Sequence, residues 1–475
     1  MKYPNILYIM PDEWRLRALG YRQEDPVYTP NVDQLASESV QLENAISNYP
    51  VCTPHRGMLF TGQYPCSARV TGNSNSSTAP WFVRLPKHRV TLSDHLHNEG
   101  YYCAYVGKWH LDSPELSDIE HLEPRRSDGK VWDAFTPEDR RHHFSYWFSY
   151  ACNDNHYMPH YWDNTNDVSA RTEFPGRWST EVEAERVIDF IRNTNDIRPK
   201  DQPFYMVWAP NPPHMPFEQH PEAFAKYYEG KDWEDLLVAE SYRALDGPKA
   251  ELSPAMQREF EANIETARRE VKDYFISITA VDYYIGQVLA VLEETGLKDD
   301  TLVIFCSDHG DLMGSHGLIR KGPWFDESVK IPYLMRWPGV LTPSKRTFLL
   351  NTPDIFPTLA NLVGLGENLP DTIEGNDLSR FILDRSAEET ISYQDEEGGL
   401  AYFINTQMNA RGVRSTKYYL VVERNAYDEE RYILYDLEED PQMLVDVSRD
   451  SPEVVREYRG LLENWMQRCE DWWLL

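Results

Sequence analysis

Cysteine is scarce in this sequence and never forms the Cys-x-x-Cys pair of thiolate metal sites. The 475 residues hold only six cysteines, too few and too scattered for a disulfide scaffold. Their spacing therefore argues against a small disulfide-stabilised protein. The six positions are 52, 66, 103, 152, 306 and 469, and five of them are expected to carry ordinary reduced thiols.

Long hydrophobic runs are also missing. No apolar stretch reaches membrane-spanning length, and residues 1–4 lead almost directly into a predicted strand, which leaves no room for a signal peptide. No membrane partner is expected. The chain as given is predicted to be cytoplasmic, or periplasmic or secreted if a leader has been trimmed.

Positive charge is in short supply, with 47 Lys and Arg against 77 Asp and Glu and a net charge of −30. This balance argues against nucleic acid as a partner, because a polyanion would be repelled. An anionic substrate would therefore need a locally basic pocket. The 14 tryptophans and 29 tyrosines are numerous, and many lie with histidines and arginines between residues 132 and 178. Such clusters occur in partly buried packing and in platforms for sugar rings.

The patterning predicts an α/β fold. The length exceeds one ordinary core, which favours a large domain plus a smaller one. Short, continuous apolar runs are typical of strands buried on both faces of a parallel sheet. Such strands are predicted at 5–10, 101–106, 203–209 and 301–306, with helices at 91–99, 181–193 and 260–292.

An acid-rich stretch at 384–399 predicts a boundary, which gives domains 1–385 and 386–475. Beyond it, residues 412–422 and 432–437 alternate like antiparallel strands, and 454–466 has the spacing of an amphipathic helix. We therefore expect a small α+β subdomain at the C-terminal end.

Polar side chains follow two of the predicted strands. Asp12 and Glu13 come after the first strand, and Asp308 and His309 come after strand 301–306. Open α/β sheets place ligands at the carboxyl ends of their strands. Together these side chains form an oxygen-rich set that suits a hard divalent cation, although each acid could equally be a solvated loop residue.

Two further loops carry basic groups. Lys108 and His110 follow a strand and point to the same side, which suits an ammonium that holds an oxyanion beside a proton carrier. Prolines fix the loop that presents His214. Either feature alone would more often be surface decoration or structural support.

Cys52 begins the run Cys-x-Pro-x-Arg-x-x-x-x-Thr-Gly, at the predicted start of a helix, where backbone N–H groups favour negative charge. A lone cysteine there is usually a small buried residue. The complete run, however, resembles the signature of the type I sulfatases of the alkaline phosphatase superfamily, in which this cysteine is oxidised to Cα-formylglycine. Gly-Lys-x-His, Pro-Pro-His-x-Pro and Asp-His-Gly resemble further blocks of that family along nearly the whole chain.

The resemblance implies a large, mostly parallel central sheet flanked by helices, with a C-terminal four-stranded antiparallel sheet plus a helix. It implies Ca²⁺, or Mg²⁺ in its place, and 3-oxoalanine (formylglycine) at position 52. Glu13 and His309 depart from the commoner Asp and Asn, which leaves the ligation by Glu13 and the metal identity open. The implied catalytic residues are Cys52, Arg56, Lys108, His110, His214 and Lys321, and the implied metal ligands are Asp12, Glu13, Cys52, Asp308 and His309.

Residues 112–180 show little regular periodicity, and we expect them to form substrate-recognition loops. Candidate substrate-binding residues are Arg171 and Arg177 in this stretch and Asn73 in the polar loop 71–75.

In the mechanism that the resemblance implies, hydrated formylglycine attacks sulfur, with Asp308 as base and His214 as acid for the leaving oxygen. His110 is then the base when sulfate is expelled.

The expected function is removal of sulfate from a sulfated mono- or oligosaccharide, and a formylglycine-generating maturation enzyme is an expected partner. Alternatives are a phosphonate monoester or phosphodiester hydrolase, an aryl sulfatase, and a catalytically silent carbohydrate-binding relative. Lys108 and His110 favour sulfate over phosphonate, and the oligomeric state stays open.

Overall fold

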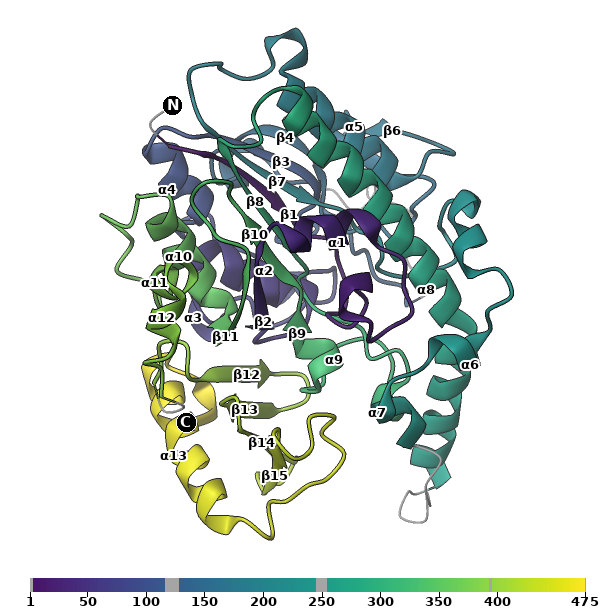
Figure 1. Ribbon diagram of the computed structural model, residues 1–475, viewed down its shortest axis with the longest axis vertical. Coiled ribbons are helices and arrows are strands. Elements are labelled where there is room, and N and C mark those ends of the chain that lie inside the picture. Colours follow the sequence, from purple (N-terminus) through teal and green to yellow (C-terminus); the bar gives the residue numbers. More distant parts are fainter. Residues whose placement is uncertain (1–2, 116–127, 245–253, 393–394, 475) are drawn as a thin grey trace.

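The structure is a computed structural model that describes residues 3–115, 128–244, 254–392 and 395–474. Figure 1 shows a large twisted sheet with helices on both faces, and below it a small sheet flanked by a single helix. This arrangement confirms the expected α/β class.

Eleven strands of the described residues form the large sheet, in the order β11-β2-β10-β8-β1-β7-β3-β4-β5-β6, with β9 beside β2. Its five central strands, from β8 to β4, run parallel, whereas β10, β5, β6 and β9 are antiparallel to their neighbours. The strands are β1 (Asn5–Ile9), β2 (Val40–Ile46), β3 (Tyr102–Lys108), β4 (Phe144–Tyr150), β5 (His160–Asp163), β6 (Thr172–Glu173), β7 (Phe204–Ala209), β8 (Thr301–Cys306), β9 (Lys330–Ile331), β10 (Tyr333–Arg336) and β11 (Ser344–Asn351).

The parallel centre decides where the site lies. Ile9 of β1 pairs with Trp208 of β7 on one side and with Phe305 of β8 on the other. The carboxyl ends of these strands therefore meet at one edge, so Asp12 and Asp308 emerge together, as the sequence predicted.

Helices cover both faces of the sheet because alternate residues of each central strand point to opposite sides. Leu7 and Ile9 face a core that includes α1, α5 and α8, whereas Ile6 and Tyr8 face one that includes α2, α4, α10 and α11. The helices are α1 (Pro30–Ser37), α2 (Cys52–Thr61), α3 (Pro65–Ala68), α4 (Leu92–Asn98), α5 (Ser179–Arg192), α6 (Trp233–Leu236), α7 (Glu240–Arg243), α8 (Pro254–Glu294), α9 (Asp326–Val329), α10 (Ile355–Leu362), α11 (Ser379–Leu383), α12 (Arg385–Glu388) and α13 (Pro452–Arg468).

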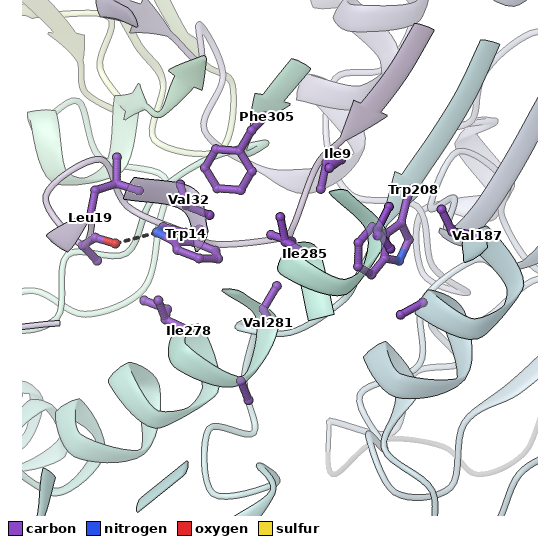
Figure 2. Packing of buried hydrophobic residues seen from close by; sticks show 14 of the residues in the cluster. Ile9, Trp14, Leu19, Val32, Val187, Trp208, Ile278, Val281, Ile285 and Phe305 are labelled. Carbon is purple, nitrogen blue, oxygen red and sulfur yellow. Dashed lines mark hydrogen bonds between the residues drawn. The ribbon is translucent and has the colours of Figure 1, made fainter. Parts of the chain in front are cut away.

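Figure 2 shows the core between the sheet and α8. The Trp14 ring is fully buried, meets Phe305 edge to face at 5.2 Å between centroids, and donates its indole N–H to the Ala18 carbonyl at 2.7 Å. Val281 and Ile285 of α8 belong to the same cluster. Burial of such side chains contributes about 1.5–3 kcal/mol each, and it fixes the loop after β1 that carries Asp12.

Helix α8 corrects one expectation. By length and composition alone it is apolar enough to cross a membrane, although the sequence pattern suggested no such run. Its most apolar window is 67% buried inside the fold, and buried core helices also reach this length and apolar composition.

Residues 112–180 also differ from the prediction. Rather than only loops, they contribute β4, β5 and β6, which extend the large sheet beyond β3. Phe148 and Tyr161 stack across two of these strands at 4.1 Å, so many of the aromatic residues in this stretch serve packing.

The small sheet consists of β12 (Ala401–Asn405), β13 (Ala410–Arg414), β14 (Tyr418–Arg424) and β15 (Glu430–Asp436), all antiparallel. The predicted strand at 412–422 is thus two strands joined by a turn. One face of this sheet packs with α13 against Tyr49 and against Met58 of the Cys52 helix, and the other packs against Trp324. The division between residues 385 and 386 stays a prediction.

Candidate active site

Cys52 lies at the first position of α2, and its side chain is buried among groups of both charges. Its sulfur is 3.3 Å from His309 Nε2 and 3.7 Å from Asp12 Oδ1. The Nζ atoms of Lys321 and Lys108 lie 3.4 and 3.8 Å from the same sulfur. The end of β3 and the loops after β1 and β8 thus converge on Cys52, as the sequence predicted.

Arg56, one turn further along α2, ties two carboxylates together. Its guanidinium Nη2 lies 3.2 Å from Asp12 Oδ2 and 3.1 Å from Asp308 Oδ2, and all three side chains are fully buried. It also donates to the Lys108 backbone carbonyl. A buried charge without a partner is costly, so this arginine fixes the position of both acids.

The side chains fit a divalent cation. Asp12, Cys52, Asp308 and His309 each offer a donor atom, and these atoms lie within 4.8 Å of one another. His309 Nδ1 is 3.0 Å from the Gly310 carbonyl, which can only accept, so this nitrogen carries a proton and Nε2 faces the site. Carboxylate and imidazole donors of this kind suit several divalent ions.

Glu13 lies in a second group, with Asp12 and His214. Its backbone has φ +67°, and its Oε2 is 3.3 Å from Lys321 Nζ and 3.4 Å from His214 Nε2. The other oxygen, Oε1, is buried without a hydrogen-bond partner among the described residues. Burial raises the pKa of Glu13 to about 8. Its carboxylate therefore faces the basic side of the pocket, and its role as a metal ligand stays a prediction.

Lys108 and Lys321 supply the local positive charge that this acidic chain requires. Lys108 Nζ is 2.7 Å from Asp12 Oδ2 and donates to Asn211 Oδ1 at 2.9 Å. Burial alone would raise the pKa of Asp12, but the two lysines hold it well below its usual value. They also lower the pKa of the Cys52 thiol against the effect of burial. Such a field suits the oxygens of a tetrahedral anion.

The two predicted catalytic histidines differ in environment. His110 Nε2 donates to the Ser74 carbonyl at 3.1 Å, and the neighbouring Cys152 sulfur raises its pKa to about 9 although burial opposes this. His214 donates from Nδ1 to the Met215 carbonyl at 2.8 Å, and burial, with Lys321, lowers its pKa to about 4.

These pKa directions are the reverse of the predicted roles, with His214 as acid and His110 as base. The negative charge of a bound sulfate ester would favour the protonated form of His214. Both roles stay predictions.

Three residues of the pocket escaped the sequence analysis. Asn211, fully buried after β7, accepts from Lys108 and donates to Asp154 Oδ1 at 3.3 Å. Asp154 Oδ1 in turn lies 3.6 Å from His214 Nδ1. Cys152 and Asp154 both follow β4, within the stretch that showed no periodicity. Only the tertiary contacts reveal them, because none belongs to a recognisable motif.

The predicted substrate-binding residues have other contacts. Asn73 Oδ1 accepts from the Thr53 backbone N–H at 3.1 Å, so it caps the helix that carries Cys52. Arg171 pairs with Glu173, and Arg177 pairs with glutamates of α5. The ion pairs shown for both arginines are thus with neighbouring acids, and their role in substrate binding stays a prediction.

A buried cysteine at a helix N-terminus, donor atoms that could hold one cation and two nearby lysines are typical of a hydrolase that acts on a tetrahedral anionic ester. Sequence comparison narrows this class. The sulfatase family profile matches residues 4–365, and the profile of the C-terminal part of N-sulphoglucosamine sulphohydrolase matches residues 314–468. The chain belongs to the sulfatase family.

Individual relatives agree with this assignment. An endo-4-O-sulfatase of Bacteroides thetaiotaomicron is 33% identical, over 99% of this chain and 93% of its own length. An ulvan-active sulfatase of Formosa agariphila is 34% identical, over 80% of this chain and 65% of its own. A solved structure from the study of glycosaminoglycan metabolism by Bacteroides thetaiotaomicron superposes with a TM-score of 0.86 at 32% identity, covering 99% of this chain and 97% of its own.

Proposed function

We propose that this protein hydrolyses sulfate esters of a sulfated carbohydrate. The observation that carries the proposal is the convergence of Lys108 and Lys321 on the Cys52 sulfur, which with Asp12, Asp308 and His309 forms a set of four donors for a divalent cation. Relatives that are named for carbohydrate sulfates support the substrate class.

The chain's own residues hold and orient the ester. Lys108 and Lys321 bind the sulfuryl oxygens, and the burial of the pocket strengthens that attraction by excluding water. Arg56 keeps Asp12 and Asp308 in place. His214 Nε2 faces the pocket at 3.4 Å from Glu13, so a proton held there can reach the leaving oxygen.

Two groups complete this machinery. Calcium is the proposed ion, with magnesium as the alternative, and Asp12, Asp308 and His309 would hold it together with position 52. Formylglycine at position 52, made by a maturation enzyme, would supply a hydrated aldehyde with two hydroxyl groups, one to form the ester bond and one to release sulfate. A thiol lacks the second hydroxyl.

Peptide mass spectrometry across Cys52, on protein co-expressed with a maturation enzyme, tests the modification. We expect a loss of about 18 Da, the change from thiol to aldehyde. The same protein should release sulfate from glycosaminoglycan oligosaccharides, and dialysis against a chelator should abolish this release until calcium is returned. A fully modified protein that ignores sulfate esters and cleaves phosphonate esters would contradict the proposal.

A further inference from the structure

Two neighbouring aromatic rings stand in solvent close to the pocket. Trp81, which ends the short 3-10 helix Ala79–Trp81, is 80% exposed, and Phe82 is 71% exposed. Single exposed apolar side chains are common, but two adjacent large rings leave much apolar surface in water. It is the adjacency of two such rings, rather than the exposure of either one, that favours a binding surface.

These rings are tied to the catalytic centre by hydrogen bonds. The Ser74 carbonyl accepts from His110 Nε2 at 3.1 Å, and the Ser74 hydroxyl donates to the Val83 carbonyl at 2.6 Å. The residue that follows Phe82 is therefore fixed to the residue that contacts His110. Trp81 and Phe82 are thus linked through Val83 and Ser74 to His110 of the candidate active site.

A third ring lies close to His110 itself. The centroid of the half-buried Trp132 ring is 6.1 Å from that of His110. Two hydrogen bonds join its segment to the loop of the outer rings, from Ser76 N–H to the Val131 carbonyl at 2.8 Å and from Val131 N–H to Ser76 Oγ at 3.0 Å. We call Trp81, Phe82 and Trp132 the aromatic rim.

A cation lies near two of the three rings. Lys130 Nζ lies 5.7 Å from the Trp132 ring centroid, and the Arg84 guanidinium carbon lies 5.8 Å from that of Phe82. Arg84 also pairs with Glu115 at 3.1 Å. In a chain with a net charge of −30, cations beside exposed rings favour a ligand that is both ring-shaped and anionic.

We propose that the aromatic rim binds the sugar rings that flank the sulfated residue in a sulfated saccharide chain. The apolar faces of sugar rings stack on Trp132 and then on Phe82 and Trp81, while sulfate or carboxylate groups of the chain meet Lys130 and Arg84. This inference rests on the proposed function and adds to it a site for a substrate longer than one sugar. A small aryl sulfate would reach the lysines without reaching the outer rings.

The preference for a saccharide over an aryl ester tests whether the aromatic rim binds sugar rings. A double variant, Trp81→Ala with Phe82→Ala, is compared with the parent enzyme on 4-nitrophenyl sulfate and on a panel of chondroitin, dermatan and heparan sulfate hexasaccharides. For the hexasaccharide that the parent hydrolyses fastest, we expect the ratio of kcat/KM on hexasaccharide to that on the aryl ester to fall about tenfold, mainly through KM. Trp132→Ala should lower the same ratio.

The matched control is Tyr427→Ala, because this ring is 86% exposed in the turn between β14 and β15, in the small sheet. This variant should keep the parent's ratio. Calorimetric titration of the same hexasaccharide into a Cys52→Ala background should show the double variant binding about tenfold more weakly, which separates binding from turnover.

Three outcomes would contradict the proposed role of the aromatic rim. The first is a double variant with an unchanged ratio of kcat/KM on hexasaccharide to that on the aryl ester. The second is a parent enzyme that hydrolyses the aryl ester but no saccharide, which would leave the sulfatase chemistry intact. Loss of binding to anionic phospholipid vesicles in the double variant, with the ratio unchanged, would assign the rings to a lipid surface. A modified parent that hydrolyses no sulfate ester would instead overturn the proposed function itself.

Discussion

The catalytic centre and the aromatic rim differ in how far their side chains are exposed to water. In the centre, Asp12, Arg56 and Lys108 are fully buried, and each charge has a partner close by. At the rim, Trp81 and Phe82 are mostly exposed. Fixed charges in a dry pocket strengthen electrostatic catalysis, whereas exposed rings keep a surface that a ligand can cover. Chemistry and choice of substrate are therefore expected to respond separately to mutation.

The largest effect is expected at the centre of the pocket. Cys52→Ala should lower sulfate release by at least about four orders of magnitude, because it removes the nucleophile position. The half-buried Cys66 in α3 offers the matched control, and Cys66→Ala should keep the parent's rate. Initial rates on an aryl sulfate measure both, and substantial turnover by Cys52→Ala would place the nucleophile elsewhere.

Removing one buried charge should damage both rate and stability. Lys108→Ala is expected to lower kcat/KM by about 10²–10³-fold, because a cation aimed at the sulfuryl oxygens is lost. It should also lower the free energy of unfolding by about 3–5 kcal/mol, because Asp12 loses its 2.7 Å partner. Urea denaturation and steady-state kinetics measure the two effects. Lys200→Ala, at a side chain that is 73% exposed, should change neither, and equal stability of the two variants would refute the argument.

A buried acid next to the centre should make stability depend on pH. Glu183 of α5 is fully buried, accepts from Tyr161 Oη at 2.9 Å, and has its pKa raised by burial from 4.5 to about 8. Between these values the folded state keeps the proton that the unfolded state releases, so stability falls as the pH rises.

For a shift of this size the loss is at most about 5 kcal/mol. Glu183→Gln should lessen the fall in stability between pH 5.5 and 8.5 by the contribution of this one group, as measured by urea denaturation at each pH. A variant with the parent's slope would show that other groups cause it.

The smallest effect is expected at the rim. Trp81→Ala should change the free energy of unfolding by no more than about 0.5 kcal/mol, because the ring packs against little. Trp14→Ala, at a fully buried tryptophan, should cost about 3–5 kcal/mol. Thermal or urea unfolding of the two variants compares them directly. A large loss at Trp81 would mean that the ring supports the fold rather than a ligand.

The sequence predicted the centre of the fold because its strands are continuous apolar runs. The runs at 5–9, 204–209 and 301–306 lie side by side in β1, β7 and β8, and the polar residues after them converge as expected. It missed β4 to β6, since a sheet margin rich in aromatic residues has no clear period. It also merged β13 with β14, because the short turn between them did not interrupt the alternation.

The sequence identified only those residues of the candidate site that belong to a recognisable motif. Asn211 contacts Lys108, and Asp154 lies near His214, although the members of each pair are far apart in the sequence. No local sequence pattern predicts such contacts. The solvent exposure of a side chain cannot be read from the sequence either, so nothing distinguished Trp81 and Phe82 from other aromatic residues in loops. Arg171 and Arg177 suggested anion binding by type and position, but each pairs with glutamates close to it in the sequence.

The packing of the small sheet against the Cys52 helix has a consequence for the order of events during synthesis. Tyr49 and Met58 share a hydrophobic cluster with Tyr402 and Trp465, and the Asn48 carbonyl accepts from the Ile404 backbone N–H. The helix that holds Cys52 therefore completes its packing only after residues some 350 positions later have been made. In the finished fold the Cys52 thiol is 1% exposed. Under the proposed modification, a maturation enzyme would therefore have to reach this thiol before the late strands pack.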